Sequence, residues 1–307
     1  MRSVLLWLSR NKTVRGLFTS LGLVQRAAHR FVSGETIEDA IQTIRELNAQ
    51  GITATLDHLG ENVETAEDAQ RATEDYLKAL DAIGASGVQS HVSIKLTALG
   101  LDLDEALCRA NVERILIKAK EIGALVTIDM ESTEYTARTL ALFRDLRCTF
   151  TNVGIVIQSY LYRSEADIVT LCKEGAHVRL CKAAYKEPPV HAFPQKADVD
   201  ASYVRLMKML LSPEARANQT FGAIATHDIK MIEATRRYAQ EQLVPRDKFE
   251  FQMLHGIRRD LQKELAADGY GMRVYVPYGT EWYPYYMRRL AERPANVWFI
   301  VSNFFRH

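Results

Sequence analysis

The chain has 307 residues and a mass of 34.8 kDa, with 47% hydrophobic and 25% charged residues. This ordinary globular composition excludes disordered, collagen-like and integral-membrane classes. Its 39 basic and 38 acidic residues give a formal net charge of +1. Because such a balance exerts no general attraction on polyanions, nucleic acid is not expected as a partner.

The first 34 residues contain six Lys or Arg residues and no Asp or Glu, so they form a basic arm. Apolar residues recur in the arm at helical spacing, which predicts short basic amphipathic helices. Such helices pack on the main domain with their basic face in solvent, which we favour, or lie on anionic lipid. A capping box of Thr36 and Asp39 predicts one further helix, stopped by Gly51. We therefore place an N-terminal helical arm at residues 1–50, and expect neither a secretory signal nor a membrane-spanning segment.

From residue 51 onward, short apolar runs alternate with helical stretches. Eight runs are predicted to be strands: 52–57, 91–96, 125–130, 154–158, 177–181, 221–226, 249–253 and 272–276. Seven helices are expected between them at 66–83, 104–122, 134–146, 165–173, 199–211, 229–242 and 258–267, and an eighth follows the last strand. Eight such repeats predict an α/β protein whose residues 51–307 form a (β/α)8 TIM-like barrel.

Active sites of this fold are built at the carboxyl ends of the strands. Every predicted strand ends in a polar or ionisable side chain: Asp57, Lys95, Asp129, Gln158, Arg179 with Lys182, Thr226 with His227, Gln252, and Tyr275. A single residue of this kind usually caps a helix or joins a surface ion pair. Eight together at one end of a barrel indicate a functional site.

The helix after the last strand carries a second signal. Pro284 suits its first turn, and Pro294 lies just past its end. Tyr285, Arg288 and Arg289 share one face of this helix, and two adjacent guanidiniums are suited to a carboxylate or phosphate. A solvated basic helix end is the alternative, but the preceding run of aromatic residues favours an anion site.

Several motifs now become recognisable by their order. They are SIKLTALG at 93–100, IDME at 128–131, VIQSYL at 156–161, RLCKAAY at 179–185, ATHD at 225–228, FEFQMLHG at 249–256, VYVPYG at 274–279 and the helix with Arg288 and Arg289. Together they resemble flavin-dependent proline dehydrogenases over residues 34–294. The length is similar to that of the monofunctional bacterial enzymes, which leaves the next step to a separate pyrroline-5-carboxylate dehydrogenase.

The resemblance implies a distorted barrel whose last helix lies over the mouth, with FAD as cofactor. It implies oxidation of L-proline to 1-pyrroline-5-carboxylate by hydride transfer to flavin N5, with electrons passed to a membrane quinone. Four cysteines without a C-x-x-C pair fit a cytoplasmic location. Peripheral contact with the inner face of the membrane is a hypothesis that rests on the basic arm.

The resemblance also implies roles for individual residues. Lys95, Arg288 and Arg289 are expected to hold the proline carboxylate, with Asp129 paired to Lys95. Asp129 and Arg179 are assigned to catalysis, with Arg179 near flavin N5. The pyrrolidine ring is expected between Leu254, Tyr275 and Tyr285. FAD contacts are expected from Met130, Gln158, Arg179, Lys182, Ala183, Ala184, Thr226 and His227; the family usually has Gly at the position of Ala183. No metal is expected.

Two other functions stay open. One is a flavin-free barrel lyase or aldolase with Lys95 as a Schiff-base nucleophile. The other is a membrane-surface binding module in which the basic arm and the aromatic C-terminus matter more than the barrel. Neither accounts for eight motifs in order.

Overall fold

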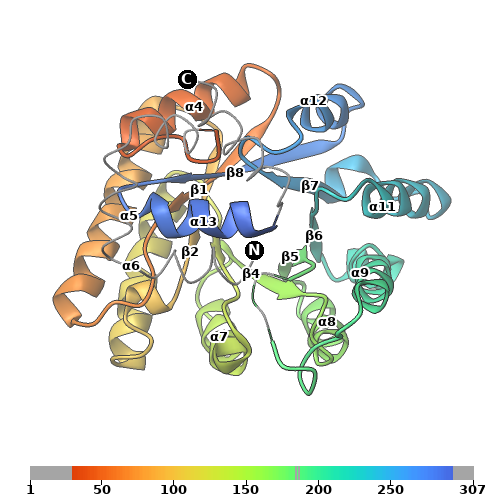
Figure 1. Cartoon of the computed structure of the whole chain (residues 1–307), viewed down its shortest axis with the longest axis horizontal. Coiled ribbons are helices and arrows are strands. Elements are labelled where there is room, and N and C mark those ends of the chain that lie inside the picture. The colour runs from red at the N-terminus through yellow and green to blue at the C-terminus, as the bar shows by residue number, and fades with distance from the viewer. Residues whose placement is uncertain (1–29, 184, 186, 293–307) are drawn as a thin grey trace, which may run out of the picture.

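The computed structural model describes residues 30–183, 185 and 187–292. Eight parallel strands form one closed barrel in chain order, and helices surround it (Figure 1). The strands are β1 (Thr53–His58), β2 (Ser90–Ile94), β3 (Val126–Ile128), β4 (Val153–Gln158), β5 (His177–Cys181), β6 (Phe221–Ala225), β7 (Phe249–Leu254) and β8 (Gly271–Tyr278). The predicted barrel is confirmed, and each predicted strand boundary lies within two residues of the observed one.

The helices of the described residues are α4 (Ile37–Asn48), α5 (Ala66–Ser86), α6 (Glu105–Glu121), α7 (Thr133–Arg147), α8 (Ser164–Lys173), α9 (Lys196–Leu210), α10 (Pro213–Ala217), α11 (Ile229–Glu241), α12 (Arg259–Ala267) and α13 (Trp282–Glu292), with 3-10 turns at Thr97–Leu99 and Arg246–Lys248. The capping box of Thr36 and Asp39 at the start of α4 is confirmed. Short α10 was not predicted; it begins where Ser212 caps its first turn.

The core lies between the strands and the helix ring. All six residues of β4 are buried, as expected for a parallel strand covered on both faces. Ile44 of α4, Leu80 of α5 and Phe143 of α7 are fully buried against the barrel. The sheet closes where β8 pairs with β1, which brings Tyr275 alongside Thr55.

Helix α13 crosses the centre of the barrel in the view of Figure 1. Its first turn is fastened to the segment before α4, because Trp282 Nε1 donates a hydrogen bond of 2.9 Å to Glu35. The ring centroids of Phe31 and Tyr286 lie 6.1 Å apart. The expectation of a last helix over the mouth is therefore confirmed.

The first described residues pack against the ends of β7 and β8. The Ser33 amide donates to the Pro277 carbonyl at 2.9 Å. Gly256 has φ +75, and a Cβ there would meet the Arg30 carbonyl oxygen at 1.7 Å, so this close approach requires glycine. Residues 1–29, which make up most of the predicted basic arm, lie outside the described residues.

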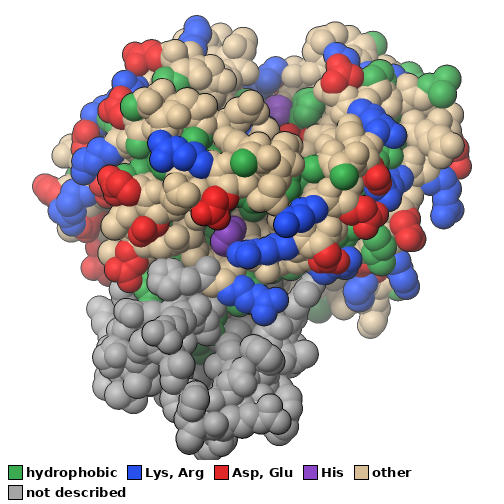
Figure 2. All heavy atoms as spheres, turned by 90° about the horizontal axis from the view of Figure 1, so that it is seen from above, with side chains coloured by type: hydrophobic (Ala, Val, Ile, Leu, Met, Phe, Trp, Pro, Cys, Tyr) green, Lys and Arg blue, Asp and Glu red, His purple; other side chains and the backbone are tan. Residues whose placement is uncertain are grey.

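The surface has mixed charge. Figure 2 shows acidic and basic side chains interspersed over the coloured part of that face, in line with the net charge of +1. Among the described residues, no helix combines the length and hydropathy needed to cross a membrane.

Candidate active site

A buried ion pair joins the carboxyl ends of β1 and β2. Lys95 Nζ donates to Asp57 Oδ1 at 2.8 Å, with exposures of 8% and 1% for the two residues. Burial acts against the charge on Lys95, but the nearby carboxylates, above all Asp57, raise its pKa well above the usual value. Lys95 is therefore an ammonium. The expected pairing of Lys95 with Asp129 is wrong, because Asp129 is engaged by other side chains.

Asp129 follows β3 and bridges side chains from β5 and β8, which lie on either side of β3 around the barrel. Its Oδ1 accepts a hydrogen bond of 2.7 Å from Arg179 Nη1, and its Oδ2 accepts one of 2.7 Å from the Tyr275 hydroxyl. The guanidinium carbon of Arg179 lies 5.4 Å from the Tyr275 ring centroid, within cation–π range. Burial and the charge of Asp129 raise the pKa of Tyr275, so the hydroxyl keeps its proton and donates. Three predicted site residues thus form one unit.

Arg179 is buried and held by several further contacts. Its Nε donates to Gln252 Oε1 at 2.6 Å, and its Nη1 also donates to Ser93 Oγ at 2.9 Å. Nη2 is buried without a hydrogen-bond partner in the protein. A buried donor without a hydrogen bond costs free energy, so Nη2 is suited to an acceptor on a bound molecule.

Gln158 at the end of β4 presents the complementary group. Its Nε2 donates to the carbonyls of Met130 and Glu131, at 3.2 and 3.4 Å. Its Oε1 is buried without a partner, and the residue is 1% exposed. One unused donor and one unused acceptor therefore occur at residues predicted to contact FAD. The flavin that the resemblance implies carries carbonyl oxygens and a ring N–H at its edge, which are groups of the complementary kinds.

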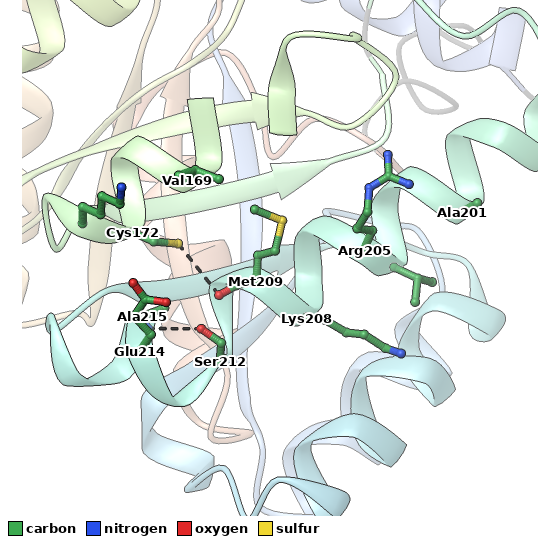
Figure 3. A pocket seen from close by; sticks show the side chains of 11 residues that line it. Val169, Cys172, Ala201, Arg205, Lys208, Met209, Ser212, Glu214 and Ala215 are labelled. Carbon is green, nitrogen blue, oxygen red and sulfur yellow. Dashed lines mark hydrogen bonds between the residues drawn. The ribbon is translucent and has the colours of Figure 1, made fainter. Parts of the chain in front are cut away.

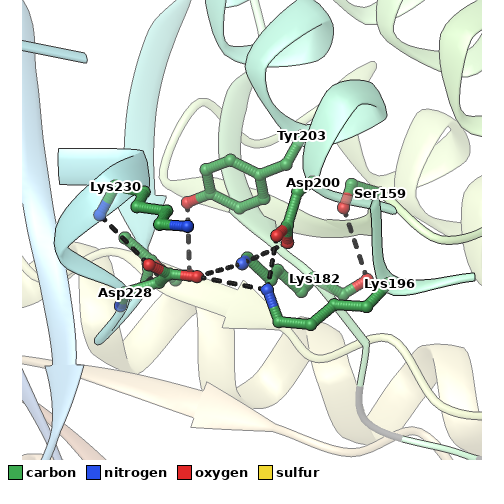
Figure 4. A network of polar contacts seen from close by, with 9 residues as sticks. Ser159, Lys182, Lys196, Asp200, Tyr203, Asp228 and Lys230 are labelled. Atoms are coloured by element: carbon green, nitrogen blue, oxygen red, sulfur yellow. Dashed lines mark hydrogen bonds and ion pairs between the residues drawn. The ribbon is translucent and has the colours of Figure 1, made fainter. Parts of the chain in front are cut away.

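Lys182, which follows β5, lies between two carboxylates (Figure 4). Its Nζ donates to Asp200 of α9 and, at 2.6 Å, to Asp228, which caps α11. Lys196 pairs with the same two carboxylates from the start of α9. Burial opposes ionisation of both carboxyls, but the hydrogen bonds of Lys182 help to hold their pKa values below the usual range. Lys182 is therefore held firmly between the two carboxylates.

Sequence reasoning missed both of these acidic partners and treated Asp57 only as one of the polar strand ends, without a role of its own. Asp57 lies near the end of β1 and Asp228 follows β6, so their positions at the mouth were a usable signal. Asp200 lies within a polar stretch of α9 and has no comparable local signature.

The structure describes most of the remaining residues predicted to contact FAD or substrate. His227 Nε2 accepts a hydrogen bond of 2.9 Å from the Leu254 amide, and Thr226 Oγ1 accepts one of 3.1 Å from the Asp228 amide. Ala183 is exposed. Ala184 lies outside the described residues.

Helix α13 brings Tyr285 and Arg289 together. Tyr285 is 6% exposed, and the guanidinium carbon of half-buried Arg289 lies 5.2 Å from its ring centroid, as their shared helical face predicts. Tyr283 and Tyr286 are buried beside Met287, so aromatic residues form much of the buried part of the helix. The side chain of Arg288 lies outside the described part of the chain.

A cavity of about 580 Å³ lies elsewhere, among α8, α9 and α10 (Figure 3). Val169, Val204 and Met209 give it an apolar wall, and basic side chains flank it. None of the predicted site residues lines it. It is therefore separate from the strand ends.

The fold and this convergence of ionisable groups define a (β/α)8-barrel enzyme with its site at the carboxyl ends of the strands. Residues 40–302 match the family model described as proline dehydrogenase. The chain belongs to the proline dehydrogenase family and has that enzymatic activity.

Named relatives cover nearly the whole chain. "Proline dehydrogenase 1" of Bacillus subtilis subsp. natto is 43% identical over 98% of each chain. "Proline dehydrogenase" of Deinococcus radiodurans is 44% identical over 90% of this chain and 89% of its own. The crystal structure of proline utilization A from Bdellovibrio bacteriovorus, inactivated by N-propargylglycine, matches with a TM-score of 0.83 and 24% identity. That match covers 99% of this chain and 39% of the longer one, and supports the fold.

Proposed function

We propose that the chain oxidises L-proline to 1-pyrroline-5-carboxylate with FAD as hydride acceptor and a membrane quinone as electron acceptor. The observation that carries the proposal is the pair of buried, unpartnered groups, Arg179 Nη2 and Gln158 Oε1, on the neighbouring strands β5 and β4. We further propose that the chain is cytoplasmic, touches the membrane peripherally, and leaves its product to a separate pyrroline-5-carboxylate dehydrogenase.

The residues proposed to hold FAD supply matching chemistry. Gln158 offers an acceptor, Arg179 offers a donor, and Lys182 adds a fixed positive charge. When bound, FAD supplies the hydride acceptor at N5. The full proposed set is Met130, Gln158, Arg179, Lys182, Ala183, Ala184, Thr226 and His227.

The proposed substrate site orients proline by its charge. The Lys95 ammonium and the guanidiniums of Arg288 and Arg289 bind the carboxylate, which fixes the ring carbon beside nitrogen in the orientation for hydride loss. Tyr275, Tyr285 and Leu254 enclose the ring and exclude water. Arg179 places positive charge where negative charge develops during transfer. Asp129 serves this step by fixing both Arg179 and Tyr275.

The alternative of a Schiff-base lyase receives little support from the contacts of Lys95. A Schiff-base nucleophile is a neutral amine, whereas the ion pair with Asp57 and the raised pKa favour the ammonium. The aromatic C-terminus of the membrane-module alternative lies outside the described residues.

Reconstitution tests the proposal. Protein stripped of flavin should take up FAD, and the holoenzyme should convert L-proline and a soluble quinone to 1-pyrroline-5-carboxylate and quinol in equal amounts. Lys95→Met should keep FAD and lose turnover, because it removes a proposed substrate contact without touching a proposed FAD contact. A wild-type protein that takes up no FAD would refute the proposal.

A further inference from the structure

A buried polar chain runs through the barrel interior from Arg179 to the backbone of β1. Arg179 Nε donates to Gln252 Oε1, and Gln252 Nε2 donates to Glu250 Oε1, both at 2.6 Å. Arg273 Nε donates to the same Glu250 oxygen at 2.8 Å, and Arg273 Nη1 donates to the Ala54 carbonyl at 2.7 Å. The four side chains are 6–8% exposed. Layers of branched apolar residues usually fill such barrels, so these buried charges require a reason.

The strand register explains how these hydrogen-bonded side chains come together. Glu250 and Gln252 lie two residues apart on β7, so both face the same side of the sheet. Arg179 of β5 is in register with Ala223 of β6. Because Ala223 carries only a methyl group, the Arg179 side chain can pass β6 and reach Gln252 on β7.

The order of donors and acceptors gives Gln252 one favourable orientation. A guanidinium only donates, an ionised carboxylate only accepts, and an amide does one at each end. Gln252 lies between Arg179 and Glu250, so its oxygen must face Arg179 and its nitrogen must face Glu250. In a flipped amide, the Gln252 nitrogen would face the donors of Arg179 and its oxygen would face the acceptors of Glu250. Although burial acts against ionisation, Arg273 lowers the pKa of Glu250 and keeps it an acceptor.

We propose that Glu250 is a positioning residue for Arg179: it fixes the amide of Gln252, and thereby aims the guanidinium that the site uses. Since the role of Arg179 in hydride transfer belongs to the proposed function, the catalytic consequence rests on that proposal. The orientation of the Arg179 side chain does not depend on the proposed function, and it can be measured without flavin.

A variant pair separates positioning from a structural ion pair. In Glu250→Gln, two amides meet and both orientations of Gln252 become accessible. The double variant Glu250→Gln, Gln252→Glu places an acceptor-only carboxylate toward Arg179. The new amide at 250 can then donate to that carboxylate and still offer an oxygen to Arg273. The matched control Glu264→Gln removes a carboxylate from an exposed ion pair with Arg236.

Three measurements on the full chain decide the matter. The first is the ¹H–¹⁵N signal of the Arg179 Nε–H in flavin-free protein, identified by its loss in Arg179→Lys. The second is kcat/KM for L-proline in the holoenzyme, and the third is the flavin midpoint potential. Glu250→Gln should speed exchange of the Nε proton and lower kcat/KM about 10- to 100-fold, the range for a hydrogen bond to a charged group. The midpoint potential should fall by ~30 mV for each tenfold loss in the reduction equilibrium constant.

The double variant should recover most of the slow exchange of the Nε proton, of kcat/KM and of the midpoint potential. The control should match the wild type in all three. Recovery of folding without recovery of the Nε signal would overturn the proposal, since Glu250 would then serve only the ion pair with Arg273. If Glu250→Gln does not fold, Gln252→Met decides, because it leaves that ion pair intact. An unchanged Nε signal and kcat/KM in Gln252→Met would also overturn it. Absence of flavin reduction in the wild type would defeat the proposed function alone, since the Nε signal still reports on Glu250.

Discussion

Replacing Asp57 by Asn should leave a buried ammonium without its counter-charge. At the observed 2.8 Å between Lys95 Nζ and Asp57 Oδ1, two unit charges attract by about 6 kcal/mol at an effective dielectric constant of ~20. Desolvation offsets part of this attraction, and breaking one partner of a buried pair typically costs about 3–5 kcal/mol. Since Asn keeps an acceptor oxygen, we expect a loss of about 3 kcal/mol in the free energy of unfolding.

Denaturant unfolding of four proteins measures this effect. Asp145→Asn is the matched control, because its ion pair with Arg109 is exposed and should be worth less than about 1 kcal/mol. Adding Lys95→Met to Asp57→Asn should restore much of the stability, since no unpaired charge then remains buried. Saturating L-proline should stabilise Asp57→Asn more than the wild type, because the substrate carboxylate replaces the lost charge. Equal stability of Asp57→Asn and Asp145→Asn would refute the reasoning.

Four further outcomes are expected. Arg288→Met and Arg289→Met should each raise KM for L-proline about 10- to 100-fold with flavin content unchanged; normal steady-state kinetics in both would show that the pair is structural. The wild type should prefer L-proline to 4-hydroxyproline by about 10- to 100-fold in kcat/KM, because the Tyr275 ring crowds an added hydroxyl; comparable efficiencies would contradict the steric role. Burial lowers the pKa of His255 to about 4, so the unfolded chain binds the proton first as pH falls below about 6.5. Through this group, the free energy of unfolding should fall by about 2 kcal/mol from pH 7 to pH 5. Denaturant unfolding of His255→Phe should show a smaller loss over this range, and a pH dependence identical to that of the wild type would rule the residue out. Full-length protein should co-sediment with anionic vesicles at low salt more than a chain that starts at Arg30, which keeps the buried Phe31; equal binding would remove the arm from membrane contact.

The position of the site was predictable, but its pairings were not. A parallel barrel places every strand end at one edge, so Lys95, Asp129, Arg179 and Tyr275 were expected near one another from spacing alone. Lys95 directly follows β2, which is flanked by β1 and β3, and both neighbouring strands offer an aspartate at their ends. Asp57 is its partner, while Arg179 of β5 and Tyr275 of β8 engage both oxygens of Asp129. That competition is set by side-chain reach in three dimensions, which the sequence does not display.

The internal charges were overlooked for a different reason. Glu250 and Arg273 lie within apolar strand runs, and a charge at such a position is itself a signal that a buried partner exists. Asp200 carried no signal of this kind, because a carboxylate in a polar stretch of a helix usually faces solvent. Its contact with Lys182 depends on how α9 is placed beside the end of β5.

The central claim is that proline gives a hydride directly to a flavin held by these strand-end residues. Anaerobic mixing of the holoenzyme with L-proline in a stopped-flow spectrophotometer tests it most directly. We predict loss of the oxidised flavin absorbance, one flavin reduced for each proline oxidised, and a slower reduction when the ring carbon beside nitrogen carries deuterium. Proline oxidation while the flavin stays oxidised, or a flavin that does not respond to proline at all, would contradict the account.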